Sequence, residues 1–421
     1  MIRRIQVLRY RCLRYVDISL GRFQMLIGPN ASGKSTLFDS ITFLSDLVRD
    51  GVEKAVGERT SDFRDLVWGR CPDSGFELAV ELNVPEEVRA RLPPQRDYEV
   101  FRYEVAIGVD KRGARITSER GLLMPLAKPR VSQGKLLFPD PPQPPSTILV
   151  GGRKRGMRTI VSKSWKGTDS YHIETTPKAG RGWVTTIAFG PYRSTLGNLP
   201  ESPGKFPMAT LVKRKLETGI RQVILNSSAM RRASPPSYGT VGLADDGSNL
   251  PWVVKDLRDQ HPESFHEWLG HVQTVLPDLA DLYVEIRPDN RHANIVLRYR
   301  TGVDVPSWTA SDGTMRLLAL TLIAYLPDNQ DTYLLEEPEN GVHPLAIQGI
   351  RDSLWSAYDA QVLVTTHAPT LLALIDPREV LCFDKDAEGA ADIVRGKDHP
   401  ALKDWQGEID MDILFAKGVA G

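Results

Sequence analysis

The chain has 421 residues, of which 41% are hydrophobic and 25% are charged, an ordinary composition for a soluble globular protein with more than one domain. Lysine plus arginine and aspartate plus glutamate number 53 each, so no overall charge favours nucleic acid and only local patches are candidates. The three cysteines lie far apart without a C-x-x-C pair, which argues against structural zinc and a disulfide framework.

The N-terminal region predicts three strands and then a helix. Residues 2–20 alternate apolar and polar side chains, as two antiparallel strands do. Residues 23–27 form a short buried strand, and residues 36–44 carry apolar side chains at helical spacing. Because the first five residues lead straight into a strand, we expect no signal peptide, and no apolar run approaches the roughly 18 residues of a membrane span. A cytoplasmic protein without membrane contact is expected.

The strand at 23–27 and the helix at 36–44 flank a sequence of the form G-x-x-x-x-G-K-[ST], the phosphate-binding loop. Its glycines let backbone N–H groups turn toward a phosphate. Lys34 is expected to reach the β- and γ-phosphates of ATP, and the Ser35 hydroxyl to hold Mg²⁺. The predicted ATP-binding residues of this loop are Gly28, Asn30, Ala31, Ser32, Gly33, Lys34, Ser35 and Thr36.

The middle of the chain predicts an antiparallel sheet followed by a mainly helical region. Residues 76–82 and 98–107 alternate like half-buried strands, and further short strands are expected at 147–150 and 184–189. Clustered prolines make 121–152 a loop or arm. From about 205 to 280 apolar residues recur at helical spacing, and we interpret the aromatic ones as core rather than as a binding stripe. Residues 281–300 predict a hairpin.

In the C-terminal third, two apolar strands end in groups that suit phosphate chemistry. Residues 332–335 lead into Glu336 and Glu337. We expect Glu336 to lie near Mg²⁺, directly or through water, and Glu337 to orient or deprotonate the attacking water. Residues 361–366 lead into His367, whose neutral ring can hydrogen-bond a γ-phosphate. A helix cap or a core position is the other interpretation of this histidine.

Together these motifs resemble the ATP-binding-cassette (ABC) class of P-loop ATPases, in the branch of RecF, the SMC proteins and the OLD-like ATPases. The resemblance covers residues 2–45 and about 305–385. In that family two head domains sandwich the nucleotide, and a signature motif from the opposite protomer covers the γ-phosphate. The matching stretch is 311–316, where Ser311 would begin a helix and Gly313 would allow close approach; a plain N-cap is the alternative for Ser311. Asn340 and His343 resemble the D-loop at the dimer seam.

The sequence departs from the family pattern in three places. Glu336 stands where most relatives have aspartate, and the signature lacks the leucine and second glycine of L-S-G-G-Q. None of Gln133, Gln143 and Gln222 is a convincing Q-loop glutamine. These departures favour slow, partner-gated hydrolysis over fast turnover.

The interval from about 45 to about 305 is rich in prolines and alternating strands, so it cannot be the long coiled coil of SMC proteins. The stretch after His367 is too short for the Toprim nuclease domain of OLD nucleases. A stand-alone bacterial ATPase without a Toprim domain is therefore expected.

Two basic clusters provide local positive charge. One is Arg153, Lys154 and Arg155, and the other includes Lys213, Arg214 and Lys215. Both fit contacts to nucleic-acid phosphates, and both fit a solvated helix face or an intersubunit surface equally well.

The expected fold is α/β, with a P-loop ABC-type ATPase head, an antiparallel β-lobe and an inserted, mostly helical subdomain. Residues 1–120 would form the N-terminal part of the head, 121–200 the proline-rich arm and remaining strands, 201–300 the insertion, and 301–421 the C-terminal part of the head. The expected function is a homodimeric or larger ATPase that needs ATP and Mg²⁺. It would act as sensor or scaffold for a separate effector such as a nuclease, in bacterial anti-phage defence. A RecF-like DNA-binding repair clamp and a non-hydrolysing nucleotide-dependent scaffold are the alternatives.

Overall fold

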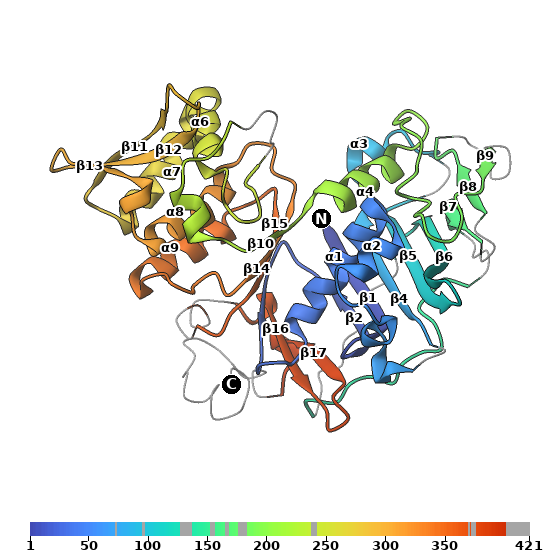
Figure 1. Ribbon diagram of the computed structural model, residues 1–421. Helices are drawn as coiled ribbons and strands as arrows, with labels where there is room; N and C mark the ends of the chain where they lie inside the picture. The colour runs from blue at the N-terminus through green and yellow to red at the C-terminus, as the bar shows by residue number, and fades with distance from the viewer. Residues whose placement is uncertain are drawn as a thin grey trace. The chain divides into compact units, whose positions relative to one another are not determined.

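The computed structural model describes residues 1–71, 74–94, 97–126, 137–151, 156–164, 168–175, 183–236, 242–368, 371 and 376–400 (Figure 1). These residues form two compact units. The first unit takes its described residues from Met1–Gly21, Gly28–Ile220 and Leu381–Asp404. The second takes them from Arg22–Ile27 and Arg221–Val380. The chain therefore passes from one unit to the other several times, and each unit contains segments far apart in sequence.

An eight-stranded antiparallel sheet forms the centre of the first unit, in the order β2-β1-β4-β5-β6-β7-β8-β9. Its two faces differ because side chains alternate along each strand. On β4, the buried apolar residues Phe76, Leu78, Val80 and Leu82 point to one face, and Glu77 and Glu81 alternate with them on the other. The strands are β1 (Ile2–Tyr10), β2 (Leu13–Ser19), β4 (Phe76–Asn83), β5 (Val100–Asp110), β6 (Gly113–Met124), β7 (Arg158–Lys163), β8 (Asp169–His172) and β9 (Trp183–Ile187).

Helix α1 (Lys34–Asp50) packs against the apolar face of this sheet (Figure 1). The ring of Phe43 lies 5.9 Å from that of Tyr10 on β1 and 5.2 Å from that of Phe76 on β4. Burial of this face supplies the hydrophobic free energy that fixes α1, and with it the loop at its N-terminus. The unit is completed by α2 (Val52–Gly57), η1 (Phe63–Leu66), η2 (Trp68–Arg70), α3 (Glu86–Arg89), α4 (Pro207–Thr218), the antiparallel hairpin of β16 (Val380–Lys385) and β17 (Ala391–Arg395), and η6 (Gly396–Asp398).

The second unit contains parallel strands covered by helices. Strand β15 (Gln361–Thr365) pairs in parallel with β14 (Thr332–Glu336) on one side and β3 (Phe23–Ile27) on the other, while β10 (Ile220–Val223) neighbours β14. Strands β3, β14 and β15 are mostly apolar and buried, as parallel strands covered on both faces are, whereas β10 is only partly buried. The other elements are α5 (Ser227–Arg231), α6 (Leu250–Gln260), α7 (Pro262–Val275), α8 (Asp312–Leu322), α9 (Pro344–Trp355), η3 (Ser307–Thr309), η4 (Ile323–Tyr325), η5 (Pro377–Glu379) and the antiparallel sheet of β11 (Leu279–Ile286), β12 (Ala293–Tyr299) and β13 (Asp304–Pro306).

Most of the expected elements are confirmed. The strands at 2–20, 23–27, 76–82, 98–107, 332–335 and 361–366, the helix after the loop and the hairpin at 281–300 all form. Phe265 and Trp268 are buried in α7, which confirms their core role. Two expectations are wrong: residues 147–150 are outside any strand, and residues 121–124 belong to β6 rather than to a loop. Within the mostly helical region 205–280, the sequence missed strand β10.

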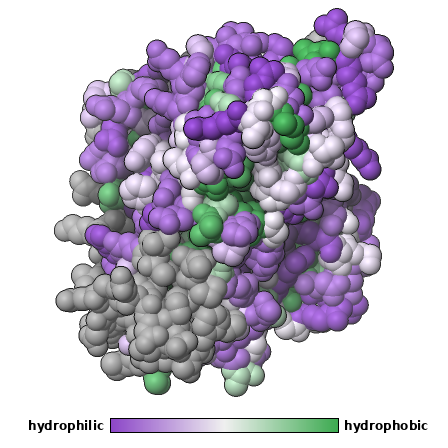
Figure 2. Space-filling model, turned by 90° about the vertical axis from the view of Figure 1, so that its left-hand side faces the viewer, coloured by the Kyte–Doolittle hydropathy of each residue, from purple (hydrophilic) through white to green (hydrophobic). Residues whose placement is uncertain are grey.

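The surface is mainly hydrophilic, as Figure 2 shows for the side that carries the three-stranded sheet, where smaller hydrophobic patches interrupt it. Among the described residues, the most exposed large apolar side chains include Leu345, Leu137 and Ile224. No helix in this part of the chain has the length and apolar character that crossing a membrane requires.

Candidate functional site

The loop at the N-terminus of α1 has the backbone that a phosphate site needs. Gly28, Ala31 and Gly33 have φ values of 144°, 62° and 110°, so three of its peptides are turned in the left-handed direction. A side chain on Gly28 would place its Cβ 2.1 Å from the carbonyl oxygen of Phe383, so no other residue fits that position without a backbone shift. The sequence GPNASGKS therefore folds as a turned loop that leads directly into a helix.

Lys34 is buried at the start of α1, and its ammonium group donates to the carbonyls of Gly28 (2.7 Å) and Pro29 (2.9 Å). Ser35 follows it in an exposed position. The Ser32 hydroxyl is buried and has no hydrogen-bond partner among the described residues. A loop that combines an orphaned buried hydroxyl, a buried cation and the positive end of a 17-residue helix fits a bound anion.

A cavity of about 530 Å³ lies in the same unit. It reaches the loop through Cys12, whose Sγ is 3.4 Å from the Thr36 hydroxyl. Three arginines, two carboxylates and one aromatic ring line it, and Arg59, on its wall, pairs with Asp39 at 2.6 Å. Its lining residues are Arg11, Cys12, Arg59, Thr60, Asp65, Val67, Trp68, Gly69, Arg70 and Glu388.

In the second unit, Glu336 and Glu337 lie where β14 ends. Glu336 is opposite Thr365 in the parallel ladder and is exposed. Glu337 adopts φ 44°, an uncommon conformation for a residue with a side chain, and its N–H donates to the Thr365 carbonyl at 2.9 Å. Asn340 donates to the Glu337 carboxylate at 2.7 Å, and Nε2 of His367 is 3.7 Å from that carboxylate. The structure thus brings three predicted site residues together: Glu337, Asn340 and His367.

Glu339 holds the histidine segment in place. One of its carboxylate oxygens accepts from the Thr366 hydroxyl (2.6 Å) and from the His367 N–H (3.1 Å). The other oxygen is buried without a partner among the described residues. The turn after β14 is thereby tied to the end of β15, and this contact sets where His367 lies relative to Glu337.

A second cavity, of about 270 Å³, opens on the two carboxylates and is also lined by Arg316 and Ile224. The Gln222 side chain donates to Glu336 at 3.3 Å. This contact could not be predicted from the sequence, because nothing there indicates that β10 lies next to β14. Arg316 stands in the signature stretch but was given no role. The signal that could have indicated a role for Arg316 was its position on α8, five residues after Ser311.

Ser311 caps α8: its hydroxyl accepts from the Thr314 N–H at 3.0 Å. A Cβ on Gly313 would lie 2.9 Å from the Gly341 carbonyl, so glycine permits close packing of α8 on the turn after β14. Within a single chain, Ser311 therefore acts as the N-cap of α8. Its contact with the γ-phosphate bound to a second chain stays a prediction. His343 likewise caps α9, where its Nδ1 accepts from the Leu345 N–H at 3.3 Å.

The basic clusters need one correction. Lys215 is buried in α4, because it lies on the face of the helix that packs inward, and it is not available to a phosphate at the surface. Lys213 is half-buried and donates to the Leu199 carbonyl, whereas Arg214 is exposed. Arg153, Lys154 and Arg155 lie outside the described residues, as does Gln133.

Comparisons with known proteins bear on the family and the fold. A family model described as "AAA domain, putative AbiEii toxin, Type IV TA system" matches residues 23–122 and 167–373, more than half of the chain. No curated protein matches the sequence. Among solved structures, the Smc head bound to the C-winged helix domain of ScpA has a TM-score of 0.53 at 12% identity, and the likeness covers 93% of this chain and 97% of that one. Smc heads from Pyrococcus furiosus (TM-score 0.49, 13% identity, 93% and 95% covered) and Thermotoga maritima (0.42, 11%, 94% and 98%) are also similar.

The structural similarity with a TM-score of 0.53 and the family match both indicate which fold the chain has. The chain has the fold of an ABC-type P-loop ATPase head with an antiparallel lobe, which confirms the fold class expected from the sequence. At 12% identity this likeness carries no further information about activity.

Proposed function

The chain belongs to the family described as AAA domain, putative AbiEii toxin, Type IV TA system, and we propose that it hydrolyses ATP with Mg²⁺ at a site completed by a second copy of itself. The observation that carries the proposal is Glu337. It has a strained backbone, and its carboxylate lies beside Asn340 and His367 at the end of a parallel strand. Strain held in place by surrounding contacts is typical of functional positions.

The roles follow from the chemistry of each group. Lys34 and the loop amides would bind the phosphates, and Ser35 with Glu336 would hold Mg²⁺, which offsets the charge of the phosphates. Glu337 would accept the proton of the attacking water, with Asn340 fixing its carboxylate. His367 would donate a hydrogen bond to the γ-phosphate. The orphaned Ser32 hydroxyl supports a ligand in the loop, because a buried hydroxyl without a partner costs free energy.

The nucleoside end of ATP is proposed to enter the 530 Å³ cavity of the first unit. Trp68 offers an indole face for stacking on adenine, and Arg11 offers a donor to the ribose or the phosphates. Mg-ATP is expected to change the tryptophan fluorescence of the wild type and to leave that of Trp68→Phe unchanged. An equal change in both proteins would remove Trp68 from the site.

A second copy is proposed because Ser311 and Gly313 begin a helix whose N-terminus would face the γ-phosphate of a partner. Two exposed apolar side chains support such a cover: Ile224, on the wall of the 270 Å³ cavity that opens on the carboxylates, is 66% exposed, and Leu345, two residues after His343, is 83% exposed. Hydrolysis would then require two chains.

The biological role we propose is a sensor or scaffold in anti-phage defence, whose nucleotide state controls a separate effector protein. The family description supports this setting, since it names a putative toxin of a toxin–antitoxin system. A DNA clamp has weaker support, because Lys215 is buried.

The direct test is release of phosphate from ATP by the purified chain. Wild type should hydrolyse ATP slowly, with a rate per molecule that rises with protein concentration, because two chains form one site. Lys34→Ala should lose nucleotide binding. Glu337→Gln should keep binding and lose cleavage even in a single turnover. If Glu337→Gln cleaves ATP as fast as wild type, the chain is not an ATPase of this mechanism and the non-hydrolysing scaffold becomes the better description.

A further inference from the structure

Helix α8 places one cation, Arg316, in the wall of the 270 Å³ cavity that opens on Glu336 and Glu337. Among the described residues that line this cavity, Arg316 alone is cationic, and the others are the two carboxylates, Asn340 and apolar side chains. None of the roles assigned above uses Arg316. A cation that shares a cavity with the proposed metal ligand and the proposed general base is a candidate for direct contact with the substrate.

Two segments from other parts of the second unit hold the Arg316 side chain in this wall. The guanidinium donates to the Leu225 carbonyl, in the segment after β10, at 3.2 Å. On the other side, a Cβ added to Gly341 would lie 3.7 Å from Nε of Arg316. Gly341 belongs to the turn after β14, which also carries Glu337. The position of the guanidinium is therefore set relative to the Glu337 carboxylate.

The charge of Arg316 is not offset by an ion pair within the part of the chain that the structure describes. Asp312 stands four residues earlier on α8, at a spacing where opposite charges pair on a helix surface. Asp312 pairs instead with Arg231, at 3.0 Å. A guanidinium carries several N–H donors, and the bond to Leu225 uses one of them. Donors therefore remain for a ligand in the cavity.

Phosphoryl transfer is a reaction that needs a fixed cation at this place. Negative charge spreads over the equatorial oxygens of the γ-phosphoryl group in the transition state, and a preorganised positive group stabilises it. A guanidinium matches phosphate oxygens because two of its N–H groups donate in parallel. In the mechanism proposed above, the γ-phosphoryl group lies next to the water that Glu337 orients. The carboxylates repel this group, and Arg316 offsets that repulsion.

From this geometry we propose that Arg316 is a further catalytic residue, whose guanidinium binds the γ-phosphoryl oxygens of ATP during hydrolysis. The bond from water oxygen to the γ-phosphorus forms while the bond to the β–γ bridging oxygen breaks. The water proton passes to Glu337, and the bridging oxygen leaves on ADP with the electron pair. Arg316 keeps all its protons and acts by charge alone. This role rests on the proposed ATP hydrolysis and adds one residue to its machinery.

The first test measures binding of a transition-state analogue by the full chain, so it does not rely on turnover. Mg-ADP with aluminium fluoride imitates the planar phosphoryl group, and wild type should bind a fluorescent ADP at least about 100-fold more tightly when aluminium fluoride is added. Arg316→Ala should bind Mg-ADP alone as wild type does and lose most of this gain. Arg232→Ala, at an exposed arginine of the same unit, is the matched control and should keep the full gain.

The second test measures cleavage of ATP in a single turnover. Arg316→Ala should cleave about 100-fold more slowly than wild type, as expected when a charge-stabilising donor is removed. Guanidinium ion, added well below denaturing concentrations, should restore part of the rate to Arg316→Ala and none to Glu337→Gln. Arg316→Lys keeps the charge without the paired donors and should give an intermediate rate. Arg316→Met fills the space without charge, and it replaces Arg316→Ala if that variant does not fold.

The outcomes separate this role from the proposed function. Suppose that Glu337→Gln loses cleavage while Arg316→Ala or Arg316→Met keeps the wild-type rate and the wild-type gain from aluminium fluoride. The role of Arg316 is then overturned and the proposed hydrolysis stands. A wild type that cleaves no ATP, and that binds Mg-ADP equally well with and without aluminium fluoride, overturns both.

Discussion

At the scale of single residues, the turn after β14 concentrates the unusual features of the second unit. Glu337 has φ 44°, a conformation that costs on the order of 1–3 kcal/mol for a residue with a side chain. Its N–H bond to Thr365 and the Asn340 bond to its carboxylate hold it there. The carboxylate is thus fixed before any substrate binds, which suits the general-base role that we propose for it.

Replacing Glu337 with glutamine keeps the size of the side chain and removes the proton acceptor. We expect phosphate release to fall by about 100-fold or more, with the affinity for Mg-ATP unchanged. Steady-state hydrolysis and equilibrium binding of a fluorescent ATP analogue measure the two effects. Glu86→Gln, an exposed carboxylate on α3, is the control and should match wild type.

Glu339 is expected to act through His367 as a positioning residue. Glu339→Ala leaves the Thr366 hydroxyl and the His367 N–H without their acceptor, so kcat should fall by roughly tenfold while the Kd for ATP changes little. Glu339→Gln retains an acceptor oxygen and should restore most of the rate. If both variants keep the wild-type kcat, Glu339 does not position His367.

The sequence predicted the site residues that stand in a recognisable local pattern. The loop 28–36 and the pair at 336–337 could be found because each follows a short apolar strand. The contacts of Glu339, Gln222 and Arg316 could not be predicted, because they join segments distant in the chain. Lys215 was misjudged because charge alone does not tell which face of a helix turns inward.

At the scale of elements, α4 begins at a buried carboxylate. Glu174 accepts from the N–H groups of Met208 and Ala209, both at 2.7 Å, and so caps the first turn from a distant segment. Burial raises the pKa of Glu174 from 4.5 to about 7, because the charged form loses its hydration. The stability that this cap provides at the N-terminus of α4 therefore depends on pH.

The sign of this coupling follows from proton release. Between about pH 4.5 and pH 7 the unfolded chain loses the Glu174 proton while the folded chain keeps it, so the free energy of unfolding falls as pH rises. Glu174→Gln has no such titration. The stability of wild type relative to this variant should therefore decrease across that window, by about 1.4 kcal/mol for each unit of pKa difference. Urea unfolding between pH 4.5 and 7.5 measures it, with the exposed Glu201→Gln as control; a constant difference would contradict the assignment.

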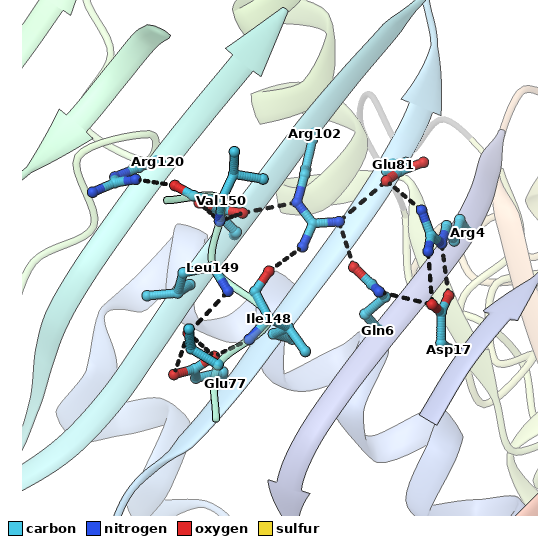
Figure 3. A network of polar contacts seen from close by, with 12 residues as sticks. Arg4, Gln6, Asp17, Glu77, Glu81, Arg102, Arg120, Ile148, Leu149 and Val150 are labelled. Atoms are coloured by element: carbon cyan, nitrogen blue, oxygen red, sulfur yellow. Dashed lines mark hydrogen bonds and ion pairs between the residues drawn. The ribbon is translucent and has the colours of Figure 1, made fainter. Parts of the chain in front are cut away.

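Elements with strong local patterns were predictable, and those defined by distant partners were not. The alternation in β4 and β5 and the apolar runs of β14 and β15 specify strands by themselves. Strand β10 has four residues, and it is a strand because it pairs beside β14 rather than because of its own sequence pattern. Residues 147–150 have strand-like composition, yet charged side chains of the sheet bind their main chain, so they do not join the sheet as a strand (Figure 3).

At the scale of the molecule, the chain builds its two units from interleaved segments. Strand β3 belongs to the second unit, and the loop that follows it belongs to the first. The phosphate loop and the carboxylate pair are therefore carried by different units. An ABC-type ATPase that needs a second copy to complete its site is expected to change its assembly with nucleotide.

The most direct test of this account is the molar mass of Glu337→Gln in solution, measured by light scattering with and without Mg-ATP. The account predicts that Mg-ATP raises the mass to that of a dimer or a larger assembly, because this variant binds ATP and does not cleave it. Adding Ser311→Arg should abolish the rise by blocking the neighbour's γ-phosphate position. A monomer under every condition, with ATP bound, would contradict the shared site.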